Sequence, residues 1–127
     1  MKLFGIGTDI VSVDRIKKSL KNKNFIKRIF NEKEIFKCKK IISSNNCFAK
    51  RFAAKEAFSK ALGTGVSNGI NFNEIVILNK KSGKPYINII GQTKKILNKK
   101  FKGKKEIISL SLSDEKKYAV AFVTISL

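Results

Sequence analysis

Apolar and polar positions along the chain predict two pairs of strands and an opening strand. The run from Leu3 to Val13 is largely apolar, and its two glycines permit close backbone approach. Ile107 to Ser113 alternates apolar and polar residues, and Tyr118 to Ile125 follows as its predicted hairpin partner. Phe72 to Leu78 and Lys84 to Ile90 predict a further pair of strands, joined by a Lys-Ser-Gly turn.

Helical spacing separates these strands. The strongest helix is predicted from Cys47 to Leu62, a stretch rich in alanine that has no proline and stops at Gly63. Weaker patterns predict helices from Asp14 to about Lys21, near Phe25 to Phe30, from Glu32 to Ile41 and from Gln92 to about Phe101. A capping box of Asn31 and Glu34 supports one of them, and the polar residues 43–46 are expected to form a loop. The sequence therefore predicts one α+β domain over residues 1–127, with a mostly antiparallel sheet packed against a long central helix.

Charge adds a preference for anionic partners. The 127 residues include 28 Lys and Arg against 9 Asp and Glu, a net charge of +19. A field of this strength attracts nucleic acid, an anionic membrane, a phosphorylated cofactor or an acidic protein. Lys, Asn and Ile are abundant together, so AT-rich coding is an equally good explanation of the excess. Charge alone does not choose among these partners.

Several classes of protein and site are not expected. No stretch approaches the roughly 20 apolar residues of a membrane span, and Asp9 interrupts the short apolar run that a signal peptide would need. We therefore expect a cytoplasmic protein with no membrane partner. Cys38 and Cys47 lack the partners of a zinc site, since the chain has no histidine, and they are expected to be reduced, incidental thiols.

Without histidine, acid–base chemistry must use carboxylates, lysines or a metal-bound water. Glu56 and Lys60 are helical neighbours at i, i+4, which is most often an ordinary surface pair. Asp9 ends an apolar stretch, where a carboxylate is most often a turn or cap residue. Together, Asp9 and Glu56 could hold a magnesium ion against phosphate oxygens, with Lys60 and Lys55 neutralising phosphate charge. Known phosphate-loop patterns such as GxxxxGK[ST] are absent.

Four segments carry a more specific signal. They are GIGTDIVSVDRI (5–16), FAKRFAAKEAFSKALGTG (48–65), SGKPYI (82–87) and SLSLSDEKKYAVAFV (109–123). In this order they resemble the sequence blocks of the acyl-carrier-protein synthases, the short single-unit phosphopantetheinyl transferases, over nearly the whole chain. The resemblance implies a magnesium-dependent homotrimer with active sites at its subunit interfaces. Its implied reaction moves 4'-phosphopantetheine from coenzyme A to a serine of an acidic acyl carrier protein in fatty acid biosynthesis.

The resemblance also implies roles for individual residues. Asp9 and Glu56 would be the metal ligands, and Glu56 and Lys60 would be catalytic. Arg15 on the first helix would bind the acidic carrier. The residues implied to contact the cofactor are Arg51, Lys55, Gly63, Gly65, Lys84, Pro85 and Ser111.

One position departs from the family pattern, because Ser109 stands where the family often has histidine. A cofactor contact from that strand is therefore in doubt. Two alternatives stay open at this point. A nucleic-acid-binding module would require exposed aromatic residues interleaved with Lys and Arg. A transferase for polyketide or peptide synthetase carriers would typically be about twice as long as this chain.

Overall fold

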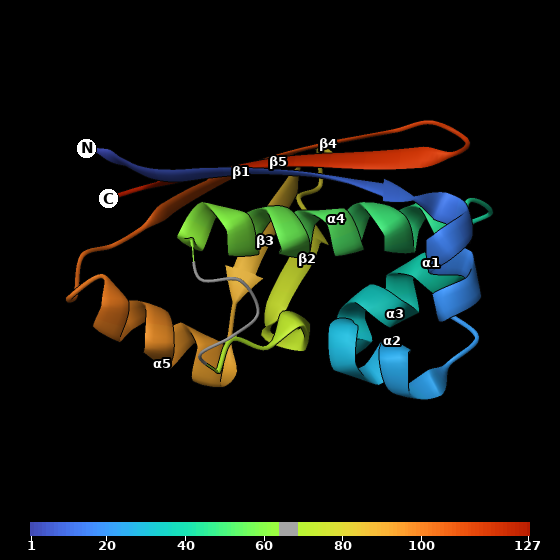
Figure 1. Ribbon diagram of the computed structural model, residues 1–127, viewed down its shortest axis with the longest axis horizontal. Helices are drawn as coiled ribbons and strands as arrows, with labels where there is room; N and C mark the ends of the chain where they lie inside the picture. Colours follow the sequence, from blue (N-terminus) through green and yellow to red (C-terminus); the bar gives the residue numbers. More distant parts are fainter. Residues whose placement is uncertain (64–68) are drawn as a thin grey trace.

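The computed structural model describes residues 1–63 and 69–127 (Figure 1). In chain order its elements are β1 (Leu3–Ser12), α1 (Val13–Ser19), α2 (Lys23–Ile29), α3 (Glu32–Lys39), α4 (Ser44–Leu62), the 3-10 helix η1 (Phe72–Glu74), β2 (Ile75–Asn79), β3 (Pro85–Ile89), α5 (Gly91–Lys100), β4 (Ile107–Asp114) and β5 (Tyr118–Ser126).

Two antiparallel sheets flank the long helix α4. The larger sheet has three strands in the order β1-β5-β4, and the smaller one pairs β2 with β3. Figure 1 shows the larger sheet as one layer, with α4 lying along one face of it, α1 at the end of α4, and α2, α3 and α5 on the far side of α4. The predicted α+β class and the long helix packed on an antiparallel sheet are confirmed. The strands form two sheets, however, because β2 and β3 pair only with each other.

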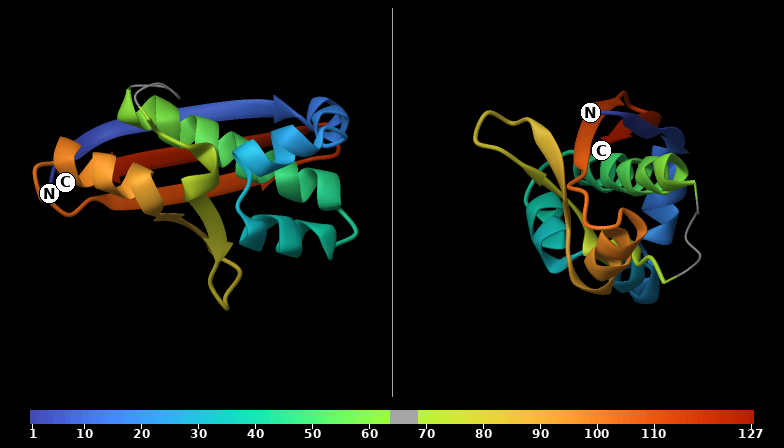
Figure 2. Two further views of the ribbon diagram at one scale, coloured as in Figure 1. Left: turned by 90° about the horizontal axis from the view of Figure 1, so that it is seen from below. Right: turned by 90° about the vertical axis from the view of Figure 1, so that its left-hand side faces the viewer.

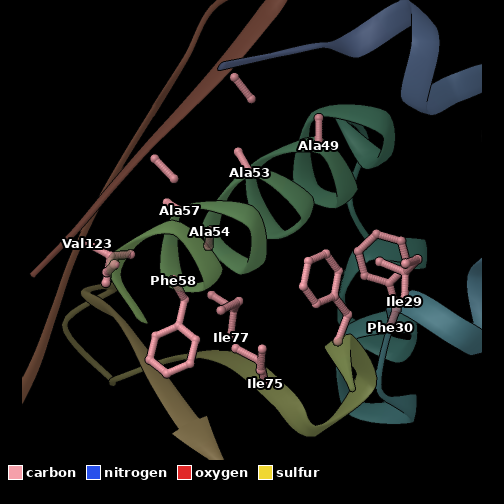
Figure 3. Close-up of a cluster of buried hydrophobic side chains, with 14 of the residues drawn as sticks. Ile29, Phe30, Ala49, Ala53, Ala54, Ala57, Phe58, Ile75, Ile77 and Val123 are labelled. Atoms are coloured by element: carbon pink, nitrogen blue, oxygen red, sulfur yellow. The ribbon is translucent and has the colours of Figure 1, made fainter. Parts of the chain in front are cut away.

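The core surrounds α4 on several sides. Alternate residues of β5, including Ala121 and Val123, are fully buried toward the helix. On another side of α4, Phe58 points toward Ile75 and Ile77 of β2 (Figure 3). A helix buried on most of its faces has no single apolar stripe. The alanine content of α4 was therefore a better predictor of the helix than the spacing of its apolar residues. Within the described part of the chain, no helix is long and apolar enough to cross a membrane.

The local capping signals act as the sequence indicated. The Ser12 side chain accepts a hydrogen bond from the Arg15 backbone N–H and so starts α1. Asn31 and Glu34 form the expected capping box of α3. Gly63 ends α4 in the left-handed region at φ 81°, where glycine is unstrained.

Two boundaries differ from the prediction by three residues each. The helix α4 begins at Ser44, so most of the polar segment expected as a loop is its first turn. The Ser and Asn residues of this segment show no apolar period that would predict a helix. Packing of the residues that follow them extends α4 over the segment. The strand expected from Phe72 begins only at Ile75, because residues 72–74 form a 3-10 turn.

The two cysteines are paired, which corrects the expectation of free thiols. Cys38 near the end of α3 and Cys47 in α4 form a disulfide, with their Cα atoms 5.4 Å apart. Both side chains are buried where the two helices pack together. The sequence alone does not show that α3 packs against α4, so it gave no reason to expect a disulfide between Cys38 and Cys47.

Candidate active site

The site begins with the close approach of β1 to α4. Gly5 and Gly7 face the helix, and a Cβ atom on Gly7 would overlap the carbonyl oxygen of Ala57. A Cβ on Gly5 would overlap the carbonyl oxygen of Ala61 in the same way. Only glycine allows the two backbones to lie this close. The next residue on this face of β1 is Asp9, which is therefore held beside the helix.

Asp9 meets a lysine of α4. Lys60 Nζ lies 3.1 Å from Asp9 Oδ1 and donates a second hydrogen bond to the Thr8 carbonyl oxygen at 2.9 Å. The Asp9 side chain is 16% exposed and the Lys60 side chain 56%. The pair is thus open to solvent on the lysine side. An ammonium so exposed can exchange its partner for an anionic ligand at small cost.

A pocket of about 450 Å³ contains this carboxylate and a second one. Asp9 from β1 and Glu56 from α4 both line it, together with Arg15 from α1. Arg15 reaches the pocket because α1 starts directly after β1, at the Ser12 cap. The predicted metal ligands Asp9 and Glu56 and the predicted carrier-binding Arg15 therefore share one pocket, although Glu56 lies far from the other two in sequence.

Electrostatics make the pocket suited to a cation. Burial raises the pKa of Glu56 above its ordinary value, the nearby Asp9 carboxylate raises it further, and Lys60 opposes both effects. Two carboxylates that repel each other at one pocket are relieved by a divalent ion between them. Among the residues that the structure describes, no cluster of three or more His, Cys, Asp or Glu occurs. Asp9 and Glu56 nevertheless fit magnesium, which is usually held by one or two carboxylates with the remaining oxygens from phosphate and water.

Comparison with known proteins identifies the family. The profile of the 4'-phosphopantetheinyl transferase superfamily matches residues 5–123. A holo-[acyl-carrier-protein] synthase of Pelagibacter ubique is 54% identical over 123 residues, which cover 97% of this chain and 96% of the relative. The chain belongs to the holo-acyl-carrier-protein synthase family. It is an enzyme, a phosphopantetheinyl transferase.

Solved structures agree with this family assignment. The crystal structure of the holo-[acyl-carrier-protein] synthase from Neisseria meningitidis matches with a TM-score of 0.85 at 37% identity, covering 98% of this chain and 99% of that one. The synthase from Bacillus anthracis, solved in complex with CoA (3',5'-ADP), matches with a TM-score of 0.80 at 35% identity and covers 98% and 97% of the two chains. The resemblance recognised in the four sequence segments is confirmed.

Lys55 of the transferase lies in the core, which conflicts with its expected phosphate contact. Its side chain is fully buried, and Nζ donates to Glu34 Oε1 at 2.7 Å and to the carbonyl oxygens of Phe72 and Ile75 at 2.8 and 2.6 Å. Burial lowers the pKa of Lys55 to about 8, although Glu34 raises it. Glu34 also accepts a hydrogen bond from the Ile77 backbone N–H. Lys55 therefore joins α4 to α3 and to the start of β2.

Arg51, one turn earlier, is placed similarly. The residue is 4% exposed, and its guanidinium donates to Asn79 Oδ1 at 2.9 Å and to the Cys47 carbonyl oxygen at 3.3 Å. Its Nε is buried and has no hydrogen-bond partner in the described structure. Residues 51 and 55 are one helical turn apart, so Arg51 and Lys55 lie on the same face of α4. This face is turned away from the pocket, which explains why both side chains are buried.

The other expected cofactor contacts that the structure describes do not line this pocket. Gly63 is exposed at the end of α4, and Gly65 lies outside the described residues. Lys84 and Pro85 belong to the β2–β3 hairpin, which projects from the body of the molecule (Figure 2). Ser111 is exposed on β4, on the face of the sheet that points away from α4. The structure of one chain does not bring Lys84, Pro85 or Ser111 to Asp9 and Glu56.

Sequence reasoning missed the aromatic wall of the pocket. Phe25 of α2 and Phe52 of α4 line it, with ring centroids 6.1 Å apart. A signal was present, because Phe52 precedes Glu56 by one helical turn and so shares its face. The position of Phe25 depends on the packing of α2 and could not be found from spacing.

Proposed function

We propose that this enzyme transfers 4'-phosphopantetheine from coenzyme A to a serine hydroxyl of an acidic acyl carrier protein. The products are the holo carrier and adenosine 3',5'-bisphosphate, and the reaction depends on magnesium. We assign it to fatty acid biosynthesis in the cytoplasm. The observation that carries the proposal is the pocket that gathers Asp9, Glu56 and Arg15, with Lys60 on its edge bonded to Asp9. The names of the similar synthases agree with this reaction.

Asp9 and Glu56 would hold the magnesium ion, which when bound supplies neutralisation of diphosphate charge. Lys60 adds a second positive charge at the phosphate that leaves with adenosine, because its exposed ammonium can turn from Asp9 to the ligand. The serine oxygen forms a bond to the β-phosphorus, and the bond from that phosphorus to the bridging oxygen breaks. Glu56 accepts the serine proton at a carboxylate oxygen.

Arg15 would bind the carrier. Its guanidinium lines the same pocket as the reacting groups, so an acidic residue beside the carrier's serine would be drawn to the correct place. The apolar rings of Phe25 and Phe52 offer a surface for apolar residues of the same carrier helix. The net charge of +19 increases the rate of encounter with an acidic protein, and added salt should reduce that rate.

We propose a homotrimer as the active form. Apolar residues are exposed on the face of the larger sheet away from α4: Ile6 (58%), Ile10 (65%), Val120 (36%) and Phe122 (45%). An exposed apolar surface that follows two paired strands favours contact with another copy. In an assembly, residues absent from this chain's pocket, such as Lys84 and Ser111, could be supplied by a neighbouring subunit. The incomplete cofactor site of the single chain supports this arrangement.

The nucleic-acid alternative gains no support from the phenylalanines of α4, which are Phe48, Phe52 and Phe58. Phe48 and Phe58 are 3% and 0% exposed, and Phe52 is half-buried in the pocket. These rings cannot stack on bases without unfolding of the core.

Intact mass spectrometry of an apo acyl carrier protein tests the reaction directly. The carrier is incubated with the enzyme, coenzyme A and magnesium, and a matched sample contains a chelator instead. We expect the mass of one phosphopantetheine to be added only when magnesium is present. Failure of the folded enzyme to modify any of several apo carriers would contradict the proposal.

A further inference from the structure

The second half of α3 and its connection to α4 carry three exposed apolar residues, Phe36, Ile41 and Ile42, which are called here the apolar tip. Their exposed fractions are 65%, 40% and 106%, which means that Ile42 projects entirely into solvent. The connection between α3 and α4 lies at the end of the molecule opposite the two chain termini in Figure 1 and in the left view of Figure 2. Isolated exposed apolar residues are common, whereas these three lie within seven consecutive positions of the chain.

Lysines surround the apolar tip. Lys33, Lys37, Lys39 and Lys40 are all exposed on α3 or directly after it. The ammonium of Lys40 lies 3.7 Å from the centroid of the Phe36 ring, so the charge borders directly on the apolar surface. Glu32 lines the same shallow groove beside Phe36. The four lysines outnumber this carboxylate, so the surface around the apolar tip has an excess of positive charge.

The apolar tip is held in its exposed position. The Cys38–Cys47 disulfide closes the segment that contains Ile41 and Ile42 into a short covalent loop. Beyond the two isoleucines, the Asn46 amide donates to Asp114 Oδ2 and to the Glu115 carbonyl oxygen, both at 2.8 Å. The loop is thus fixed at both ends and is not a frayed helix terminus. Exposure of its side chains is a property of the folded state.

The apolar tip also lies apart from the other surfaces used by the enzyme. Phe52 and Glu56 face the catalytic pocket, whereas Lys55 faces α3 through its ion pair with Glu34. Figure 2 shows α3 and α1 on different sides of α4, and Figure 1 places the larger sheet beyond α4. A partner bound at the tip would leave both the pocket and the outer face of the sheet free.

We propose that the apolar tip docks the enzyme on the surface of an anionic lipid bilayer. A single projecting isoleucine loop with neighbouring Phe36 can enter the soft boundary between headgroups and acyl chains, whereas a protein partner would need a matching cavity. The surrounding lysines complement anionic headgroups. Attachment is peripheral, because no described helix can cross a membrane. The proposal departs from the sequence-based expectation of no membrane partner, and it adds to the transfer reaction without depending on it.

Vesicle cosedimentation of the full chain tests the proposal. Vesicles of phosphatidylcholine with phosphatidylglycerol are compared with vesicles of phosphatidylcholine alone. The variant Phe36→Ser/Ile42→Ser removes the apolar contact, and Lys39→Glu/Lys40→Glu reverses the neighbouring charge. The matched control is Lys80→Glu/Lys81→Glu, which makes the same charge change at exposed positions of the β2–β3 turn.

We expect the enzyme to bind the anionic vesicles and to bind neutral vesicles far more weakly. Both tip variants should lose at least about tenfold in vesicle affinity, while the control should lose much less. Absence of binding to anionic vesicles would overturn the proposal. So would equal losses in the tip and control variants, because they would indicate attraction by overall charge alone. Turnover of a soluble carrier should stay at the wild-type level in the tip variants, so vesicle binding and the transfer reaction are judged separately.

Discussion

Lys60 Nζ lies 3.1 Å from Asp9 Oδ1, and this ion pair joins α4 to β1 at the edge of the pocket. The two residues are 51 positions apart in the chain. Their meeting requires that β1 lie against α4 without intervening side chains, which Gly5 and Gly7 make possible. The candidate active site of this transferase therefore depends on glycine packing as much as on its charged groups.

Substitution of either pocket carboxylate should abolish transfer. We expect Asp9→Asn and Glu56→Gln to lower turnover by about a hundredfold or more, because the proposed magnesium site would lose one of its two protein ligands. Far-ultraviolet circular dichroism should show an unchanged fold. A matched control is Glu115→Gln in the exposed β4–β5 turn, which should transfer normally. Wild-type turnover in either pocket variant would remove the metal-site assignment.

The raised pKa of Glu56 predicts a pH-dependent stability without magnesium. A carboxyl group with a raised pKa in the folded state favours folding while it is protonated, and this contribution is lost as pH rises through the folded pKa. Glu56→Gln should therefore be more stable than the wild type at pH 7, and this difference should vanish below the ordinary pKa of glutamate. Urea denaturation with a chelator at several pH values measures it. A constant difference at all pH values would argue against the shift.

Reversal of the charge at Arg15 should affect the carrier more than the cofactor. We expect Arg15→Glu to raise the KM for the carrier by about tenfold or more and to leave the KM for coenzyme A nearly unchanged. Lys95→Glu on α5 makes the same charge change at an exposed position far from the pocket, and should have a much smaller effect. Equal changes in both KM values for Arg15→Glu would argue against carrier docking by α1.

Addition of one methyl group to β1 should disturb the site. In Gly7→Ala the new Cβ would overlap the Ala57 carbonyl oxygen, so β1 must move away from α4. Such overpacking typically costs about 1–3 kcal/mol of stability. Turnover should fall as well, because Asp9 moves with the strand. Ser113→Ala on exposed β4 is the control, and thermal unfolding with the carrier assay is the measurement. An unaltered melting temperature and activity would contradict the close approach.

Removal of the buried ammonium of Lys55 should destabilise the fold. Lys55→Met leaves the Glu34 carboxylate buried without its partner, at a cost of about 3–5 kcal/mol. The double variant Lys55→Met/Glu34→Gln should recover part of this loss, because no unpaired charge remains. Urea denaturation measures all three proteins. If Lys55→Met left stability unchanged and raised only the KM for coenzyme A, the phosphate contact expected from the sequence would be right instead.

The sequence by itself determined the elements and the family. Capping residues such as Asn31 and Gly63 act through neighbours within a few positions, so their effect can be predicted without a fold. Four segments in a fixed order also identified the transferase family, and they pointed to Asp9 and Glu56 as partners. Local chemistry and motif order were sufficient for these conclusions.

Only the tertiary structure decided which side of α4 each charged residue faces. Lys55 and Glu56 are adjacent in sequence, yet one is buried against Glu34 and the other lines the pocket. The pairing of Cys38 with Cys47 likewise required α3 to be packed on α4. A helix covered by a sheet, a hairpin and other helices has no single apolar face, so its pattern cannot show which neighbour covers which residue. That choice is made by packing between segments distant in the chain, which sequence spacing does not record.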